Sequence, residues 1–313
     1  MARAQGARSQ MALAFETVYG TSPVSGYKQI PFASTSLGGE QPLLDSELLG
    51  FGRDPLAPIK DALNADGDVV IPIDVENFGF WLKAAFGQPV TTGTTPKIHT
   101  FSSGGFTLPS MSIETQMPEV PRFAMYSGCM VDEIGWEMRR SGLLTATAKL
   151  IAQGETVAGT TAAGALTAQT LQRFGHFNGS ITRDAVAYAN ITSARINYKN
   201  GLERIDSIRA DGKIDGLDPA MAMLSGTLEA RFADLALFNQ AIAGTPCTLV
   251  FTHTLSANAS FTLTAHEVYL PRPRVSIEGP GGIQATFDWQ AAKAVLTPFR
   301  MCTAVLTNTV ASY

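Results

Sequence analysis

Hydrophobic and polar residues alternate along much of this chain, a pattern that is typical of β-strands with one buried face. The alternation is clear over residues 143–150, 194–198 and 284–289. An Asn-Gly pair at positions 200 and 201 follows the second run and predicts a hairpin turn. The fold class expected from these patterns is mainly β, a β-rich α+β fold of antiparallel sheets.

One shorter segment has the spacing of a helix. Asp74 follows the strand-like run 68–73 and can accept hydrogen bonds from the free N–H groups of a first helical turn. Gly87 can end this helix in a left-handed conformation. The predicted apolar stripe consists of Phe78, Trp81, Leu82, Ala85 and Phe86.

A second segment has the same design. Asp234 follows the alternating run 227–232 and is the predicted cap, and Gly244 is the predicted stop. The predicted apolar stripe consists of Leu235, Phe238 and Ile242.

These two segments belong to a longer pattern that occurs twice. Asp74 and Phe78 match Asp234 and Phe238 at an offset of 160. Four further matches have similar offsets: Asp45-Ser46 with Asp206-Ser207 (161), Asp54-Pro55 with Asp218-Pro219 (164), Gly67 with Gly226 (159), and Gly87 with Gly244 (157). Two copies are too few for a solenoid, so the repeat predicts two domains of one fold.

The repeat places the first domain at residues 23–153 and the second at 171–313. Residues 1–22 are expected to form an N-terminal arm, and the small, weakly polar stretch 154–170 is expected to be a linker or loop. The first copy has the longer stretch after its helix, which predicts an extra loop within 92–105. The arm, this loop and the turn at 50–55 are expected to become ordered only on assembly.

Composition narrows the function further. The chain has 313 residues, of which 45% are hydrophobic and 16% charged, as in a globular protein. A net charge of −4 provides no overall basic surface for tight nucleic-acid binding. Three widely spaced cysteines favour a reduced, cytosolic origin. The apolar run 11–15 is too short for a signal peptide, and no stretch has the length of a transmembrane helix.

Patterns that would indicate catalysis are missing from the sequence. The four histidines show no HExxH motif or close pairing with cysteine, and they are interpreted as strand or surface residues, although a dispersed zinc site stays open. Gly50 and Gly52 are followed by Asp54-Pro55, which favours a turn over a dinucleotide-binding loop. No GxSxG motif occurs. We therefore expect no enzyme, no bound metal and no cofactor.

The segment from Ser46 to Pro89 resembles the tail tube protein family, the major tail proteins of long-tailed bacteriophages. The similarity extends to FETVYGTSP at 15–23 and ITSARINYKNGLERI at 191–205, and so to most of the chain. Its most specific part is the GRDP segment followed by a strand, an Asp-capped helix and a glycine stop. Four residues of that segment are the candidate contacts between subunits or rings: Gly52, Arg53, Asp54 and Pro55.

The resemblance implies two tandem domains, each of two packed antiparallel sheets with a flanking helix. It implies a structural protein of the virion tail, assembled in the cytoplasm of the host bacterium. Such proteins form rings that stack into a tube, with a β-barrel around a channel. Double-stranded DNA passes through this channel without being tightly bound, and we expect acidic residues to outnumber basic ones on the channel wall.

A duplicated chain would form a pseudo-six-fold ring from three copies, with a ring of six copies as the alternative. The other partners implied by the family are the tape measure protein, the tail terminator and the distal tail proteins. A different member of the same machine, a tail-terminal or baseplate ring protein that does not polymerise, is the alternative function.

Overall fold

The computed structural model describes residues 3–188, 190–231, 235–275, 279 and 282–313. The chain is mainly β, with 49% of it in strands, and this confirms the predicted fold class. Within the described residues there are two α-helices, α1 (Phe78–Phe86) and α2 (Ala236–Ala243), and two single turns of 3-10 helix, Gly6–Arg8 and His176–Asn178.

The strands of the first half are β1 (Gln10–Phe15), β2 (Lys28–Gln29), β3 (Ser34–Thr35), β4 (Gly38–Glu40), β5 (Leu43–Leu44), β6 (Ile59–Lys60), β7 (Asn64–Pro72), β8 (Val90–Thr92), β9 (Lys97–Ser102), β10 (Met111–Met117), β11 (Arg122–Arg139), β12 (Thr145–Ala152) and β13 (Gly154–Ala158). Those of the second half are β14 (Thr167–Ala168), β15 (Gly179–Arg183), β16 (Val186–Ala187), β17 (Ile191–Lys199), β18 (Leu202–Ile205), β19 (Gly216–Pro219), β20 (Met223–Arg231), β21 (Cys247–Ser256), β22 (Ala259–Tyr269), β23 (Gln284–Ala292) and β24 (Cys302–Asn308).

A long antiparallel sheet runs through both halves of the chain. Its strand order is β3 and β4, then β7, β12, β11, β17, β20, β23 and β22. This order consists of two groups of four positions, β3/β4-β7-β12-β11 and β17-β20-β23-β22. In both groups the strands follow one another along the chain in the same order. In each group the strand before the helix, β7 or β20, lies between an earlier strand and a later one.

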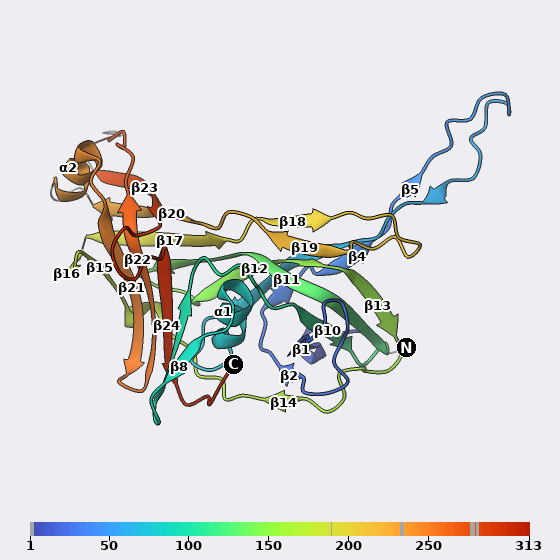
Figure 1. Ribbon diagram of the computed structural model, residues 1–313, viewed down its shortest axis with the longest axis horizontal. Helices are drawn as coiled ribbons and strands as arrows, with labels where there is room; N and C mark the ends of the chain where they lie inside the picture. Colours follow the sequence, from blue (N-terminus) through green and yellow to red (C-terminus); the bar gives the residue numbers. More distant parts are fainter. Residues whose placement is uncertain (1–2, 189, 232–234, 276–278, 280–281) are drawn as a thin grey trace.

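Two further groups of strands complete the fold. The first part of β11 pairs with β10 and β13, and β10 pairs with β1, so β11 passes from one layer to the next. At the other end, β22 pairs with β21 and β24, and β24 pairs with β9 of the first half. Strands from the two halves are therefore shared, and Figure 1 shows β24 beside β8 and α1.

Helix α1 is buried almost on every side. Phe78 is fully buried and makes edge-to-face contacts with Trp136 of β11, at 6.2 Å between ring centroids, and with Phe261 of β22, at 5.2 Å. All five residues of the predicted stripe are buried, so the predicted stripe is confirmed. The core around α1 is one continuous cluster with residues from both halves.

The cap of α1 differs slightly from its prediction. The N-cap residue is Asn77, and its side chain makes no cap hydrogen bond. Asp74 performs the capping from three residues earlier, because its carboxylate accepts hydrogen bonds from the N–H groups of Asn77 and Phe78, both at 2.9 Å. Gly87 ends the helix at φ 91° and ψ −170°, a positive φ outside the left-handed helical region.

Helix α2 is less buried, and its predicted stripe is wrong. The helix buries Leu237 and Ala241, whereas Leu235 is 54% exposed and Ile242 is 52% exposed. The helix begins at Ala236, and the pair four residues apart that faces the sheet is 237 and 241. Gly244 ends it in the left-handed conformation as predicted. The predicted cap, Asp234, lies outside the described residues.

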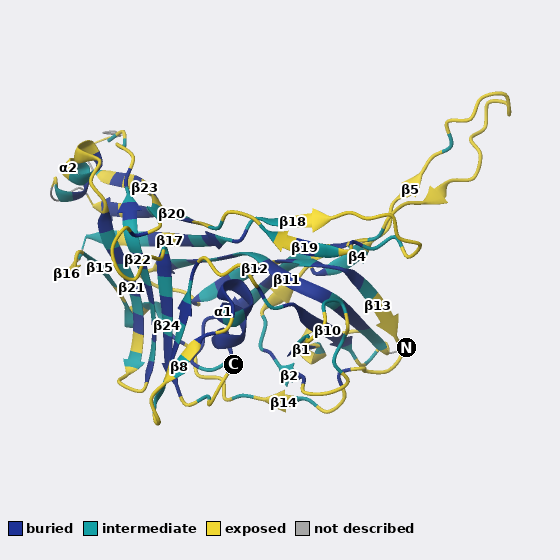
Figure 2. Ribbon diagram, in the orientation of Figure 1, coloured by how far each residue is buried: buried dark blue, intermediate teal, exposed yellow. Residues whose placement is uncertain are grey.

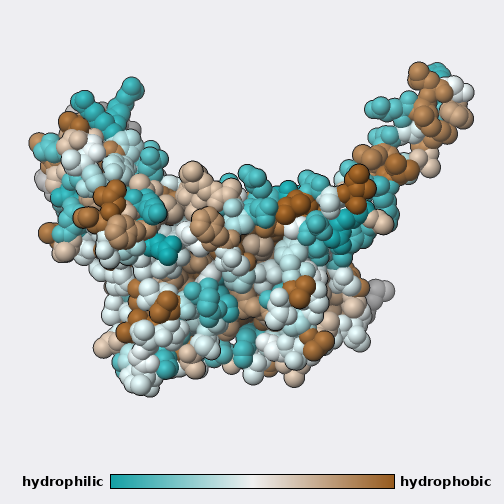
Figure 3. All heavy atoms as spheres, viewed as in Figure 1, coloured by the Kyte–Doolittle hydropathy of each residue, from teal (hydrophilic) through white to brown (hydrophobic). Residues whose placement is uncertain are grey.

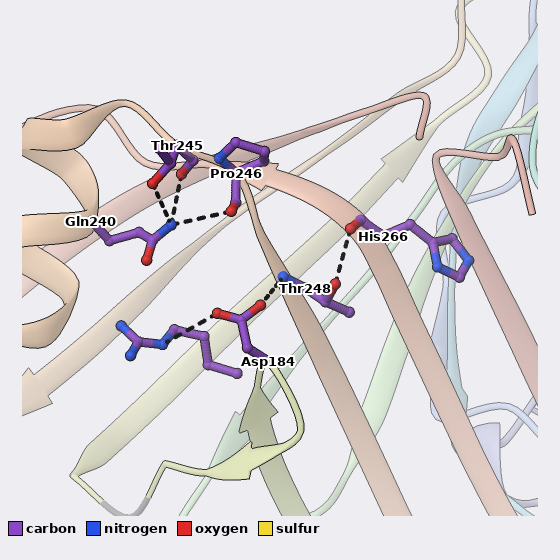
Figure 4. Close-up of polar contacts among 7 residues, drawn as sticks. Asp184, Gln240, Thr245, Pro246, Thr248 and His266 are labelled. Carbon is purple, nitrogen blue, oxygen red and sulfur yellow. Dashed lines mark hydrogen bonds and ion pairs between the residues drawn. The ribbon is translucent and has the colours of Figure 1, made fainter. Parts of the chain in front are cut away.

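The end of α2 is tied to the strand that follows. Gln240 donates from Nε2 to the carbonyl oxygens of Thr245 and Pro246, at 2.7 and 3.2 Å (Figure 4). Asp184 accepts a hydrogen bond from the N–H of Thr248 at 2.8 Å, which joins β21 to the turn after β15 (Figure 4).

Three segments that were predicted as an arm, a loop and a linker are built into the sheets. Residues 10–15 of the predicted N-terminal arm form β1, in which Met11 is fully buried. The predicted loop 92–105 contains β9, and Phe101 is fully buried there. The predicted linker 154–170 contains β13 and β14, and Ala163 is buried. Each of these strands is short and has a partner far away in the sequence, so no local pattern indicated it.

Candidate assembly surfaces and channel wall

One face of the long sheet is polar. Cross-strand partners in an antiparallel sheet point to the same side, so the register defines rows of side chains on this face. One row runs Asp68, Lys149, Glu133 and Lys199 across β7, β12, β11 and β17. A second runs Glu137, Arg195, Thr227 and Asp288 across β11, β17, β20 and β23. Charges of opposite sign therefore alternate across the strands.

Several of these charges are paired. Lys149 Nζ lies 3.0 Å from Glu133 Oε2, and the hydrogen bond raises the pKa of the lysine. Glu137 contacts Arg139 at 2.6 Å and Arg195 at 3.6 Å, and the hydrogen bond from Arg139 lowers the pKa of the carboxylate. Because these pairs are open to solvent, they add little stability.

Acidic residues outnumber basic ones on this face. The acidic strand residues are Glu40, Asp66, Asp68, Glu133, Glu137, Glu229, Glu267 and Asp288, and the basic ones are Arg139, Lys149, Arg195, Lys199 and Arg231. Ser, Thr, Asn and Gln occupy many of the remaining positions, as in β12, where Thr145 and Thr147 alternate with buried alanines. The opposite face of the sheet packs on the core and α1 (Figure 2).

A hairpin arm, β5–β6, projects from the body of the molecule. It spans residues 41–63 and carries the candidate contacts Gly52, Arg53, Asp54 and Pro55 near its tip, all of them exposed (Figure 1). Figure 3 shows hydrophobic residues along this arm. The large apolar side chains exposed there are Leu43, Leu44, Leu48, Leu49, Phe51, Leu56 and Ile59.

A second hairpin, β18–β19, lies at the corresponding place in the second half, but it is folded onto the body. Leu202, Ile214 and Leu217 of this hairpin pack against Met130 and Leu108 of the first half. The Asn200-Gly201 pair lies at a bend between β17 and β18 and does not form the predicted tight hairpin. At this bend Asn200 Nδ2 donates a hydrogen bond to Val131 O at 2.8 Å.

The two hairpins also correct one match of the repeat. Asp54-Pro55 lies near the tip of the β5–β6 arm, whereas Asp218-Pro219 lies in β19. The sequence similarity of these dipeptides is therefore not a structural equivalence.

An open hollow of about 630 Å³ lies where β20 and β23 meet the segment before β24. Its lining includes four large apolar residues that are more than half exposed: Phe106, Met221, Met223 and Phe299. Lys293 and Arg300 also line the hollow. It is thus an apolar surface with positive charge at its rim.

One edge of the long sheet is open. β3 and β4 pair with β7 on one side, and no strand among the described residues pairs with their other side. At the far end of the sheet, β22 pairs with β23 on one side and with β21 on the other, and it ends at Tyr269. An open edge such as that of β3 and β4 is a template for pairing with another chain.

Among the described residues, no group of three or more His, Cys, Asp or Glu side chains is placed to hold a metal ion. Burial raises the pKa of the Cys247 thiol to about 11 and lowers that of His253 to about 4. His99, His253 and His266 lie in strands, as interpreted from the sequence.

A comparison with protein families identifies the chain. The profile of the phage tail tube protein family matches residues 6–291, which cover most of both halves, including the β5–β6 arm. The chain belongs to the phage tail tube protein family. It is a structural protein of a phage tail and not an enzyme.

No protein with a curated description matches the chain in a sequence comparison. No helix in the described part of the chain has the length and hydrophobicity needed to cross a membrane.

Proposed function

We propose that this tail tube protein self-assembles into rings that stack into the tail tube, and that the polar face of the long sheet lines the channel through which DNA leaves the phage head. The observation that carries this proposal is the continuous antiparallel sheet with one buried face, one polar face and an open edge at β3 and β4. If a neighbouring chain pairs with that edge, and so on around a ring, the sheets close into a barrel that leaves no such edge exposed.

The contact between the two halves suggests how one chain meets the next. β11 pairs with β12 along one edge and with β17 along the other, and β17 belongs to the second group of strands. β22 has the place of β11 in the second group, and β3 with β4 has the place of β17 in the first. A chain that repeats this contact would pair its region after Tyr269 with β3 and β4 of its neighbour.

The duplication supports three chains per ring. Two copies of the four-strand group in each chain would give a pseudo-six-fold barrel from three chains, through a heterologous contact that closes on itself. A ring of six chains is the alternative. The tandem domains 23–153 and 171–313 are part of this proposal, although strands such as β9 and β24 join the two halves in the isolated chain.

A polar wall with an excess of acidic residues suits the passage of DNA. Each phosphate that a protein neutralises adds a favourable, salt-sensitive contribution to binding, so a basic wall would hold DNA. The polar face has eight acidic and five basic residues among its described strands. On this proposal, DNA in transit meets no net attraction from the wall.

Electron microscopy of the purified protein tests this proposal against the alternative. Long cylinders of constant diameter are expected if the chain is the tube subunit. Single rings that do not stack would instead indicate a tail-terminal or baseplate ring protein. The tape measure, tail terminator and distal tail proteins remain the expected partners of the tube in the virion, and the bacterial cytoplasm the expected place of assembly.

A further inference from the structure

We infer that the β5–β6 arm of one chain lies in the apolar hollow on the second half of the neighbouring chain. The β18–β19 hairpin, which lies on the first half of its own chain, provides the template for this contact. The inference rests on the proposed self-assembly, because the neighbouring chain is a second copy.

The two hairpins correspond residue by residue. Leu43 pairs with Lys60, and Leu202 pairs with Pro219, so both positions differ by 159 (202 − 43 and 219 − 60). The same offset holds in the sheet, where Gly38 pairs with Asp66 and Asn197 pairs with Ser225 (197 − 38 and 225 − 66). The hairpins are therefore equal in length and continue equivalent strands.

The strands next to them correspond as well. Gly67 faces Leu150, and Gly226 faces Trp289, which gives an offset of 139 between β12 and β23 (289 − 150). Both glycines lie on the buried side of the sheet. At Gly226 a Cβ would lie 1.9 Å from Arg195 O and 2.6 Å from the Trp289 ring, so only glycine fits there.

The β18–β19 hairpin contacts five residues of the first half, and these residues define the template for the contact. Gly212 O accepts a hydrogen bond from Leu63 N at 3.1 Å. Arg204 donates to Asn64 Oδ1 at 3.0 Å and forms an ion pair with Asp66. Ile151 packs in the apolar cluster under the hairpin. The stem of Lys213 passes over Gly154, with its Cε 2.8 Å from where a Cβ would be.

The offsets carry these five positions into the hollow. Leu63, Asn64 and Asp66 correspond to Ala222, Met223 and Ser225, and Ile151 and Gly154 correspond to Gln290 and Lys293. All five of these residues line the hollow. The surface that the second hairpin covers within the chain is thus matched by a surface that is left as an open hollow by the described residues.

The arm has the chemistry to fill it. Its exposed apolar residues, such as Leu48, Leu49 and Phe51, match the exposed Phe106 and Met221 of the hollow. The arm of the same chain points away from β20 and β23, so the occupant is a second copy (Figure 1).

Charge is complementary at the tip. Lys213 corresponds to Asp54 (213 − 159), and its contact Gly154 corresponds to Lys293. The arm therefore brings the Asp54 carboxylate to the Lys293 ammonium of the neighbour. This places the candidate contact residues Gly52, Arg53, Asp54 and Pro55 between adjacent chains.

Cysteine crosslinking tests this placement. The three native cysteines are buried, so a variant with Asp54→Cys and Lys293→Cys presents two new accessible thiols per chain. Mild oxidation after assembly is expected to give covalent multimers on a non-reducing gel. A matched control carries Glu47→Cys with Lys293→Cys, because Glu47 is exposed on the same arm but corresponds to Asp206, away from the five contact positions.

Charge reversal provides a second measurement. Asp54→Lys alone and Lys293→Asp alone each place like charges together and are expected to raise the protein concentration needed for assembly about tenfold. The double reversal restores opposite charges and is expected to return that concentration close to the wild-type value. Glu47→Lys, the control, is expected to leave it unchanged.

The outcomes separate this inference from the tube proposal. Tubes that form without the specific crosslink, together with single reversals that behave as wild type, overturn the inference and leave the tube intact. A specific crosslink in rings that never stack supports the contact and overturns polymerisation into a tube. Wild-type protein that stays monomeric and gives no crosslink overturns both.

Discussion

At the scale of single residues, the core depends on side chains whose charge state is fixed by burial. His253 of β21 is fully buried, with Phe174 nearby at 6.2 Å between ring centroids. Burial is the main reason that its pKa falls from 6.5 to about 4, and the nearby His176 lowers it further. In the folded chain, His253 therefore stays neutral at pH values where it is protonated in the unfolded chain.

The resulting pH dependence has a definite sign. The folded pKa of His253 is below the unfolded value, so the unfolded state binds more protons and the free energy of unfolding decreases as the pH falls below 6.5. The loss approaches its full size, roughly 3 kcal/mol, near pH 4. Denaturant titrations of the isolated chain between pH 7 and pH 4 measure it.

The His253→Leu variant is expected to lose stability less steeply with acid than the wild type. Some slope remains, because burial also lowers the pKa of His99 and of His266. Parallel slopes for the variant and the wild type would show that His253 does not contribute.

At the scale of elements, the two helices follow equivalent strands but contribute unequally to the core. Phe78 in α1 is fully buried between strands from both halves, whereas Phe238 in α2 is only partly buried and lies 5.7 Å from the guanidinium of Arg272. Phe78 and Phe238 therefore have similar positions, in the helices that follow β7 and β20, but they differ in how deeply they are buried.

Truncating the two phenylalanines is expected to give different losses. Phe78→Ala leaves a cavity in a close-packed aromatic cluster and is expected to cost about 3–5 kcal/mol. Phe238→Ala is expected to cost less, about 1 kcal/mol, because the ring is only partly buried. Chemical denaturation of both variants measures the difference, and equal losses would contradict the burial argument.

How much of these elements could be predicted from the sequence depends on how strong each local pattern is. The runs 143–150 and 284–289 and the α1 stripe combine regular spacing with large apolar residues, and the structure has them as strands and a buried helix. Strands β9 and β24 pair across 200 residues of sequence, and no local pattern reports such a partner. Sequence spacing also does not indicate which of two equal hairpins folds back onto the body.

The candidate site shows the same division. Gly52 to Pro55 could be marked from a family resemblance, but their position on a projecting arm follows only from the structure. The polar face could not be assigned from the sequence, because it is defined by the register of β7, β12, β11 and β17 and not by any one strand.

At the scale of the whole molecule, we propose that a contact inside the chain is repeated between chains on assembly. The pairing of β11 with β17 and the packing of β18–β19 join one four-strand group to the next inside the chain. Three surfaces correspond to this internal contact but have no partner within the described chain. They are the open edge at β3 and β4, the β5–β6 arm, and the hollow at β20 and β23. On this account, assembly repeats between chains a contact that folding has already made within each chain.

The most direct test is a helical reconstruction of the assembled protein by electron cryomicroscopy. The account predicts a continuous β-barrel channel with three chains per ring, with Glu133, Glu137 and Arg195 on the channel wall. Six chains per ring would contradict the pseudo-six-fold arrangement of three chains, but the proposed tube function would still hold. A channel lined by any other surface, or an assembly in which the polar face is covered by protein, would contradict the central claim.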